Sequence, residues 1–299
     1  MTDDREQVCY NFAVHERPCA VWSLDLAVEN QAFIAGVDHS YFSALVETQV
    51  PLLESEERRM NAALAIRLTY GHALETFYAM VGAALQAPRC PLGWILAYKP
   101  EELRSLLEDV QANRLQFSRL PGPTTWESLS DVIHWRLSPE QEPLKRRFAN
   151  LWRRLAGDYI NELKGAEYNS LKHGLRVRPG GFSLRIGSAK EIGGPPIIDS
   201  KSVFGSRFLQ RSKLDRYNFS LESAGVNWNP VALAVRVEFL SMSLNNVLCY
   251  LQEHCGTERS TVRLLWPEGP TNAWELPWQA DFTIEQMKGA VSSRQKTYT

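Results

Sequence analysis

The sequence predicts a mainly α-helical fold of the α+β class, a bundle of four or five long helices with a small antiparallel β-unit inserted after the fourth or fifth helix. The first observation is that apolar residues recur at three- and four-residue spacing over most of residues 40–174. The second is that the pattern after Gly174 changes into short alternating runs separated by glycine and proline. The third is an apolar seam over residues 230–251, which predicts a helix that completes the bundle and ends at Gly256.

The same patterns divide the chain into five segments. We expect an N-terminal segment with a strand, a helical bundle, a basic β-insertion, a helix that completes the bundle, and a C-terminal strand and tail. In that order the segments span residues 1–38, 39–174, 175–228, 229–256 and 257–299. The strand of the N-terminal segment is expected within residues 20–28, where apolar and polar residues alternate loosely, and it would pair with the later β-region.

Prolines and apolar patterns indicate the helices of the first third of the chain. A first helix begins near residue 40 and stops at Pro51, and residues 57–86 form the next helix. Apolar residues cover nearly the whole circumference of this second helix, which predicts a central and mostly buried position. Pro100 at a first helical position, followed by two acidic residues, predicts the start of another helix.

Capping signals indicate the next two helices. Thr124, with Glu127 three residues later, predicts the start of a short helix, and residues 138–141 repeat this signal. From there we expect one long helix with His173 in its last turn. Gly174 would end this helix, because glycine readily adopts the left-handed backbone of a helix terminus.

Short alternating runs predict the β-unit. Residues 175–186 are expected to form a β-hairpin, because two such runs flank the Pro-Gly-Gly turn at residues 179–181. Further strands are predicted near residues 202–209 and 217–222, and one more over residues 261–266. These strands would form a small antiparallel unit beside the helices.

Composition and charge indicate an ordinary globular protein. Hydrophobic residues make up 44% of the chain and the net charge is −1, so the whole chain is not a polycation that coats nucleic acid. The five cysteines form no Cys-x-x-Cys pair, which argues against a zinc site and a disulfide framework. The N-terminus lacks a secretion signal, and no uninterrupted apolar stretch reaches about 18 residues. We therefore expect a cytoplasmic protein with reduced thiols, no membrane partner and no cofactor.

One segment departs from this near-neutral charge. Residues 174–216 contain nine Lys and Arg against three acids, a net charge of +6, with phenylalanine and tyrosine between them. A basic surface with interleaved aromatic residues can hold single-stranded nucleic acid. Arg176, Arg178 and Arg185 are the candidate nucleic-acid contacts. The alternative is that these arginines only face water and protect strand edges.

Two groups of polar residues lie beside apolar helix faces. At about 100° per residue, Glu162, Asn169 and His173 share one stripe of the predicted long helix. His72 and Glu75 lie one turn apart on the central helix. Because a buried polar group without a partner costs about 1–3 kcal/mol, we expect the two groups to face each other across a helix–helix contact.

Three interpretations of this contact stay open. It can be a satisfied polar network that only sets the register of the two helices. It can be a catalytic or RNA-contacting site built on His173, since histidine is the usual acid–base group near neutral pH. It can also be a metal site made of His72, Glu75, Glu162 and His173. The sequence has His-x-x-Glu once, however, where two-metal helical bundles have Glu-x-x-His twice.

The end of the predicted long helix, Asn169-Ser-Leu-Lys-His173, resembles the Arg-Asn-x-x-x-His pattern of HEPN-domain proteins. The resemblance implies a compact helical bundle, usually dimeric. It also implies a metal-independent ribonuclease of a toxin–antitoxin, antiphage or CRISPR system, or an inactive binding module of the same family. His173 would be the catalytic histidine and Asn169 its polar companion. Tyr168 stands where the family has Arg, and Lys172 or one of the following arginines is the candidate for that positive charge.

The leading hypothesis is therefore an HEPN-like RNA-binding protein or metal-independent ribonuclease, in which His173 acts as acid or base. The residues expected to support the site are Glu162, Tyr168, Lys172, His72 and Glu75. The alternative is a non-catalytic interaction or structural module whose polar stripe only fixes helix packing, and a metalloenzyme is third. The expected partners are RNA and a second copy of the chain in a homodimer.

Overall fold

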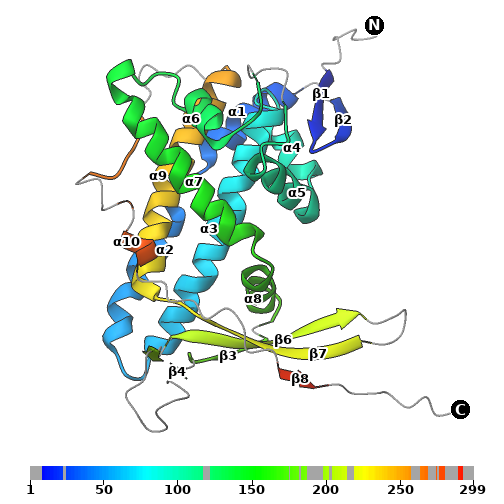
Figure 1. Ribbon diagram of the computed structural model, residues 1–299. Helices are drawn as coiled ribbons and strands as arrows, with labels where there is room; N and C mark the ends of the chain where they lie inside the picture. Colours follow the sequence, from blue (N-terminus) through cyan, green and yellow to red (C-terminus); the bar gives the residue numbers. More distant parts are fainter. Residues whose placement is uncertain are drawn as a thin grey trace, which may run out of the picture. The chain divides into compact units, whose positions relative to one another are not determined.

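The computed structural model confirms a mainly α-helical protein with small antiparallel sheets (Figure 1). It describes residues 9–22, 25–116, 122–174, 176–181, 183–186, 198–201, 204–213, 219–256, 263–268, 274, 276–279 and 289–291. Within that part, five helices of eleven residues or more precede the β-unit that follows Gly174. The fold class predicted from the sequence is therefore right.

The helices begin and end close to the prolines and capping residues of the sequence. They are α1 (Leu26–Gly36), α2 (Tyr41–Gln49), α3 (Arg59–Gln86), α4 (Pro91–Ala97), α5 (Pro100–Gln111), α6 (Trp126–Ile133), α7 (Glu142–Ile160), α8 (Glu162–Lys172), α9 (Pro230–His254) and α10 (Leu276–Gln279), with the 3-10 helices η1 (Val50–Glu54) and η2 (Pro139–Gln141). The central helix predicted over residues 57–86 is α3. The cap of α6 is Thr125 rather than Thr124, since the Thr125 hydroxyl accepts a hydrogen bond from the Ser128 N–H at 3.2 Å.

The described strands form three antiparallel sheets. β1 (Cys9–Val14) pairs with β2 (Arg17–Trp22), β4 (Ser183–Ile186) pairs with β5 (Ile198–Lys201), and a four-stranded sheet has the order β3 (Val177–Pro179), β6 (Gly205–Lys213), β7 (Phe219–Asn227), β8 (Gly289–Val291). The hairpin predicted over residues 175–186 is wrong, because β3 pairs with β6 while β4 pairs with β5. Gly180 of the predicted turn instead extends the pairing of β3 with β6, since its N–H donates to the Gly205 carbonyl at 3.0 Å. The strands predicted near residues 202–209 and 217–222 are present as β6 and β7.

The long helix predicted to end at Gly174 is interrupted at Asn161. This residue has an extended backbone, with φ −66° and ψ 121°, and its side-chain oxygen accepts a hydrogen bond from the Lys164 N–H at 2.9 Å. Asn161 is therefore the N-cap of a new helix, α8. Apolar residues recur at helical spacing both before and after Asn161, so the sequence pattern predicts one continuous helix and misses this second start. Residues on α7 and α8 consequently do not share one continuous stripe.

Two other strand predictions also need correction. The N-terminal strand, expected within residues 20–28, is β2; it pairs with β1 rather than with the later β-region, and α1 begins at Leu26. The strand expected over residues 261–266 is described from Arg263 on, where the chain has no regular secondary structure. The reason is that the Asn246 side chain occupies the backbone hydrogen-bonding groups of Leu265. It accepts from the Leu265 N–H and donates to the Leu265 carbonyl, each at 2.8 Å.

The chain forms two compact units. Unit 1 consists of residues 1–43, 72–160 and 238–270, and unit 2 consists of residues 44–71, 161–237 and 271–299. Helices α3 and α9 therefore contribute residues to both units. The five-segment division of the chain stays a prediction.

The core of unit 1 is rich in tryptophan. Trp94, Trp126 and Trp152 are almost completely buried. Each indole N–H donates a hydrogen bond to an oxygen 2.8–3.1 Å away. These bonds allow large rings with a polar group to fill the interior without leaving a donor unpaired.

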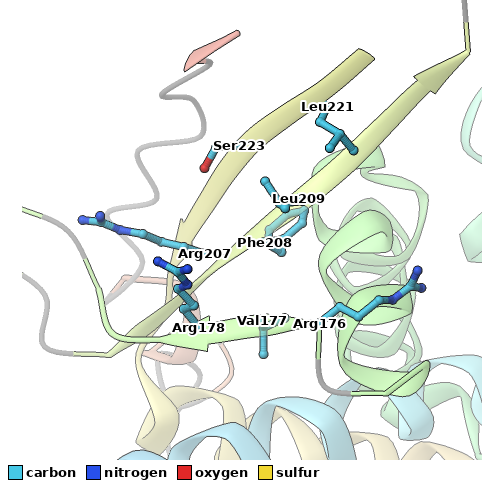
Figure 2. Close-up of a pocket in the computed structure, with 8 residues that line it drawn as sticks. All are labelled: Arg176, Val177, Arg178, Arg207, Phe208, Leu209, Leu221 and Ser223. Atoms are coloured by element: carbon cyan, nitrogen blue, oxygen red, sulfur yellow. The ribbon is translucent and has the colours of Figure 1, made fainter. Parts of the chain in front are cut away.

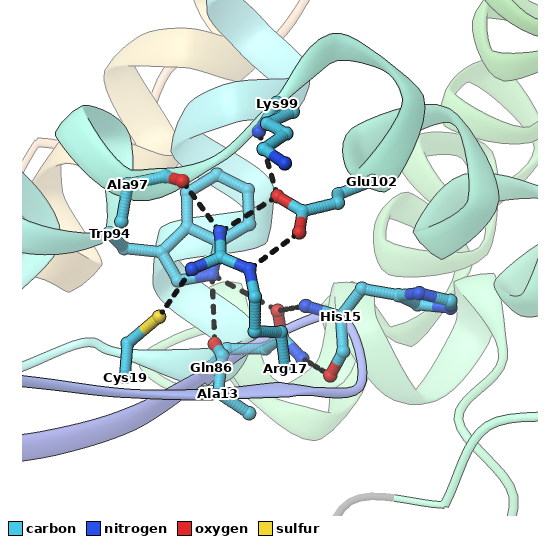
Figure 3. A network of polar contacts seen from close by, with 9 residues as sticks. All are labelled: Ala13, His15, Arg17, Cys19, Gln86, Trp94, Ala97, Lys99 and Glu102. Carbon is cyan, nitrogen blue, oxygen red and sulfur yellow. Dashed lines mark hydrogen bonds and ion pairs between the residues drawn. The ribbon is translucent and has the colours of Figure 1, made fainter.

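Polar contacts of Gln86 and Arg17 help to hold the β1–β2 hairpin on the helices of unit 1 (Figure 3). The side-chain amide of Gln86 accepts from the His15 N–H and donates to the His15 carbonyl, both at 2.9 Å. Arg17 places its guanidinium fork on the Glu102 carboxylate at 2.7 and 2.9 Å, which lowers the pKa of Glu102 to about 2. The hairpin turn, where His15 has a left-handed backbone with φ 53°, is thereby fixed to α3 and α5.

Helix α9 is the one described helix that is long and apolar enough to cross a membrane. Of its most apolar 18-residue window, 72% is buried inside the protein. A helix in the core of a protein has the same length and composition, so α9 by itself is weak evidence for a membrane span. The cytoplasmic location and the homodimer stay predictions.

Candidate nucleic-acid interface

The four-stranded sheet of unit 2 has one buried and one exposed face. Side chains alternate along a strand, so Ser206 and Phe208 of β6 share the buried face with Val226 of β7. Arg207 and Leu209 lie on the opposite face and are exposed, Leu209 by 60%. Phe208, one of the aromatic residues expected among the charges, is only 3% exposed and belongs to the core. The solvent face thus carries arginine beside apolar surface.

Two arginines lie directly opposite each other on the exposed face. Arg178 of β3 pairs with Arg207 of β6 in the antiparallel register, and both side chains are exposed. Like charges at opposite positions destabilise a sheet, on a scale of about 0.2–1 kcal/mol. Among the residues that the structure describes, neither guanidinium has an ion-pair or hydrogen-bond partner. A bound anion would stabilise this arrangement.

A groove of about 740 Å³ runs beside the arginine pair (Figure 2). Arg178 and Arg207 lie together at one end, and Arg176 projects at the other end. Val177 lies between Arg178 and Arg176 on β3, and Leu209 and Leu221 of β6 and β7 add apolar lining. The groove therefore offers positive charge at two places with apolar surface between.

A buried carboxylate fixes the elements around this groove. Glu167 of α8 is fully buried, and its Oε2 accepts two hydrogen bonds from the guanidinium of Arg67 on α3, at 2.9 and 2.6 Å. Its Oε1 accepts from the Trp228 indole N–H at 2.8 Å and from the Ser206 hydroxyl of β6. One side chain of unit 2 thus ties α8 to α3 and to the sheet. Because Ser206 precedes Arg207, the same contact positions the exposed arginine pair.

The side chains of His173 and Asn169, at the end of α8, are exposed to solvent. That of Glu162 is exposed as well, so these three residues do not form a buried network. The His173 N–H donates to the Asn169 carbonyl at 3.0 Å, and Gly174, with φ 95°, ends the helix as predicted. The Arg176 N–H then donates to the Ser170 carbonyl at 2.9 Å, which holds the start of β3 near the helix end. His173 is therefore accessible to a large ligand.

Tyr168 has a packing role in unit 2. A Cβ at Gly71 of α3 would lie 2.3 Å from the Tyr168 ring, so only glycine allows the ring to approach this closely. The ammonium of Lys172 lies 5.4 Å from the centre of the same ring, a cation–π contact. That Lys172 supplies the positive charge of the HEPN arginine stays a prediction.

The remaining candidate residues lie elsewhere. His72 and Glu75 belong to unit 1, where they line a separate pocket. Their contact with the polar residues of α8 would join the two units and stays a prediction. Arg185 lies on β4, whose side chains are outside the described part of the structure. No three His, Cys, Asp or Glu side chains gather among the described residues, so the metal hypothesis has no support there.

Sequence reasoning missed the residues that hold the site together. Arg67 lies in a mostly apolar stretch of α3, and a buried arginine requires a carboxylate partner, which is a usable signal. The sequence alone does not choose between Glu162 and Glu167 as that partner. Arg207 was counted only as one basic residue of many, because the register that places it opposite Arg178 depends on residues far apart in the chain.

Fold and site together define a mainly α-helical protein with an arginine-lined groove on a small antiparallel sheet. In the comparisons with known proteins, the chain matches no family model, no curated protein and no solved structure. The argument for its function therefore comes from the geometry of its own residues.

Proposed function

We propose that this protein binds single-stranded RNA on the exposed face of the four-stranded sheet. Arg178 and Arg207 are the central phosphate contacts, and Arg176 extends the site. The observation that carries this proposal is the pair of facing arginines, for which no described residue supplies a counter-charge. A phosphate between them would replace repulsion by two charge-assisted hydrogen-bonding contacts. The planar guanidinium fork suits phosphate better than an ammonium would.

The make-up of the groove favours a flexible single strand over a duplex. The exposed Leu209 and the half-buried Leu221 line this groove beside the arginines. A splayed base can rest on such apolar surface, or on a guanidinium plane, while its phosphate meets an arginine. The HEPN-like residues Asn169 and His173, shortly before Arg176, support RNA as the nucleic acid.

The double substitution Arg178→Ala/Arg207→Ala is expected to weaken the binding of a fluorescein-labelled oligouridylate by about 10–100-fold. The slope of log Kd against log salt concentration should also become shallower by about 1.4, the contribution of two phosphate contacts on a single strand. Fluorescence anisotropy over a series of KCl concentrations measures both quantities.

The matched control is Arg89→Ala, at an exposed arginine between α3 and α4, which should change neither affinity nor slope. Because the two facing arginines repel each other, the stability of the single variants provides a second measurement. Either single substitution, at Arg178 or at Arg207, should leave the free energy of unfolding unchanged or raise it by up to about 1 kcal/mol. An unaltered affinity of the double variant would overturn the proposal.

A ribonuclease is the second candidate, and the exposure of His173 at the end of α8 favours it. The imidazole would accept the proton of a 2′-hydroxyl or donate a proton to the leaving oxygen, while the arginines hold the phosphate. His173→Ala should then abolish cleavage of RNA, keep oligouridylate affinity within about twofold, and change stability by less than about 0.5 kcal/mol. His254→Ala, at an exposed histidine of unit 1, is the control. Cleavage that persists without His173 excludes it as the acid–base group.

A further inference from the structure

A second pocket, of about 490 Å³, lies in unit 1. Its floor is one face of α3, because His72, Glu75, Thr76 and Ala79 follow one another at three- and four-residue spacing. The volume is within the range of small-molecule sites, which combine apolar walls with a few polar groups. The RNA proposal makes no use of this pocket.

Aromatic rings form the walls of the pocket, and neighbouring rings hold them in place. Tyr41 and Phe42, at the start of α2, meet edge to face with centroids 5.2 Å apart. On another side Tyr98 stacks on Trp94 with centroids 5.1 Å apart and ring planes 18° apart. Trp94 is itself buried and hydrogen-bonded through its indole N–H (Figure 3). Tyr98 is therefore held by a buried ring, whereas Tyr41 is 54% exposed.

Glu75 gives this aromatic pocket a negative charge. Apart from His72, it is the one residue with an ionisable acidic or basic side chain, other than tyrosine, among those that line the pocket. Burial raises the pKa of Tyr98, and the negative charge of Glu75 raises it further. The same two causes raise the pKa of the nearby Tyr159, against a smaller opposite effect of Arg104. The carboxylate of Glu75 thus lies among the lining residues, close enough to Tyr98 for its charge to act on the ring hydroxyl.

We propose that the pocket binds a small organic cation, an ammonium ion with an apolar body. Aromatic rings attract a cation, and Tyr41, Phe42 and Tyr98 line the pocket together with Glu75, which supplies the counter-charge. Ala79 on the floor leaves space for the apolar body. A neutral ligand of similar shape gains only the apolar contact, and an anion is repelled.

The test is a calorimetric titration of the full chain with benzyltrimethylammonium, benzyl alcohol and benzoate. The cation should bind at least about tenfold more tightly than the neutral and the anionic ligand. Glu75→Gln keeps the shape of the side chain and removes its charge. It should weaken binding of the cation by about tenfold or more and leave that of benzyl alcohol unchanged.

Glu101→Gln, at an exposed acid in the first turn of α5, is the matched control and should bind the cation like the original chain. Tyr41→Leu is a second variant at an exposed position, and it should also weaken cation binding because it removes a ring face. Equal affinity for the three ligands, no binding of the cation, or an unaltered cation affinity in both Glu75→Gln and Tyr41→Leu overturns the inference. These results leave the RNA proposal untouched, because the pocket and the groove share no residue.

Discussion

Replacement of Glu167 by alanine is expected to lower the free energy of unfolding by about 3–5 kcal/mol. The side chain of Arg67 is only 6% exposed, so the substitution leaves a buried guanidinium without the carboxylate that neutralises it. It also removes the acceptor of the Ser206 hydroxyl and of the Trp228 indole N–H. Each buried donor that loses its acceptor adds a desolvation cost. Denaturant unfolding followed by circular dichroism measures the loss.

Glu162→Ala tests whether any acid of α8 would have the same effect. Glu162 is exposed in the first turn of the helix, so its removal should cost less than about 1 kcal/mol. The double variant Arg67→Ala/Glu167→Ala should lose less free energy of unfolding than the two single variants lose together. The difference should be about 0.5–3 kcal/mol, because each single change already breaks the same ion pair. Additive effects, or a loss below about 1 kcal/mol for Glu167→Ala, would contradict the assigned role.

The sequence predicted the features that depend on local spacing. The all-round apolar pattern of residues 57–86 identified α3, and Pro230 marked the start of α9. The prediction that Gly174 ends the helix was also correct. Its φ of 95° is one that glycine adopts with little strain. Such signals lie within a few residues of the structure that they specify, so a single sequence is enough to find them.

The parts that were missed depend on contacts between distant residues. The turn at residues 179–181 predicted a hairpin with the next run, but β3 pairs with β6, whose Arg207 is 29 positions after its partner Arg178. Only this pairing brings two like charges face to face and makes the groove. The burial of Glu167 and the exposure of His173, on one short helix, likewise follow from what surrounds α8 rather than from its own sequence.

The protonation state of His134, buried at the end of α6, can be assigned from its neighbours. The Leu265 N–H donates to the Asn246 side-chain oxygen at 2.8 Å, so the Asn246 nitrogen faces the ring and donates to Nε2 of His134 at 3.1 Å. Nδ1 lies 2.9 Å from the Ser130 carbonyl and can only donate to it. The imidazole is therefore neutral with its proton on Nδ1, and Nε2 has no place for a second proton.

Acidification is expected to destabilise unit 1 through this histidine. Burial, against the rings of Phe148 and Trp152 at 4.5 and 5.4 Å, lowers the pKa of His134 from 6.5 to about 4, and the charge of Lys145 adds to this effect. Between these two values the unfolded chain binds a proton that the folded chain does not. The stabilising contribution is therefore complete above about pH 6.5 and declines as the pH falls, by about 3 kcal/mol at pH 4. Denaturant unfolding at a series of pH values measures this slope.

His134→Gln should be less stable than the original chain near neutral pH, because it loses the ring packing, but its stability should change little between pH 6.5 and 4.5. The exposed His173 provides the matched control, since His173→Gln should keep the original slope. The acid Glu102, whose pKa is lowered from 4.5 to about 2 by Arg17, loses its contribution only below about pH 4.5, outside this window. The same slope in His134→Gln and in the original chain would show that the proton is taken up elsewhere.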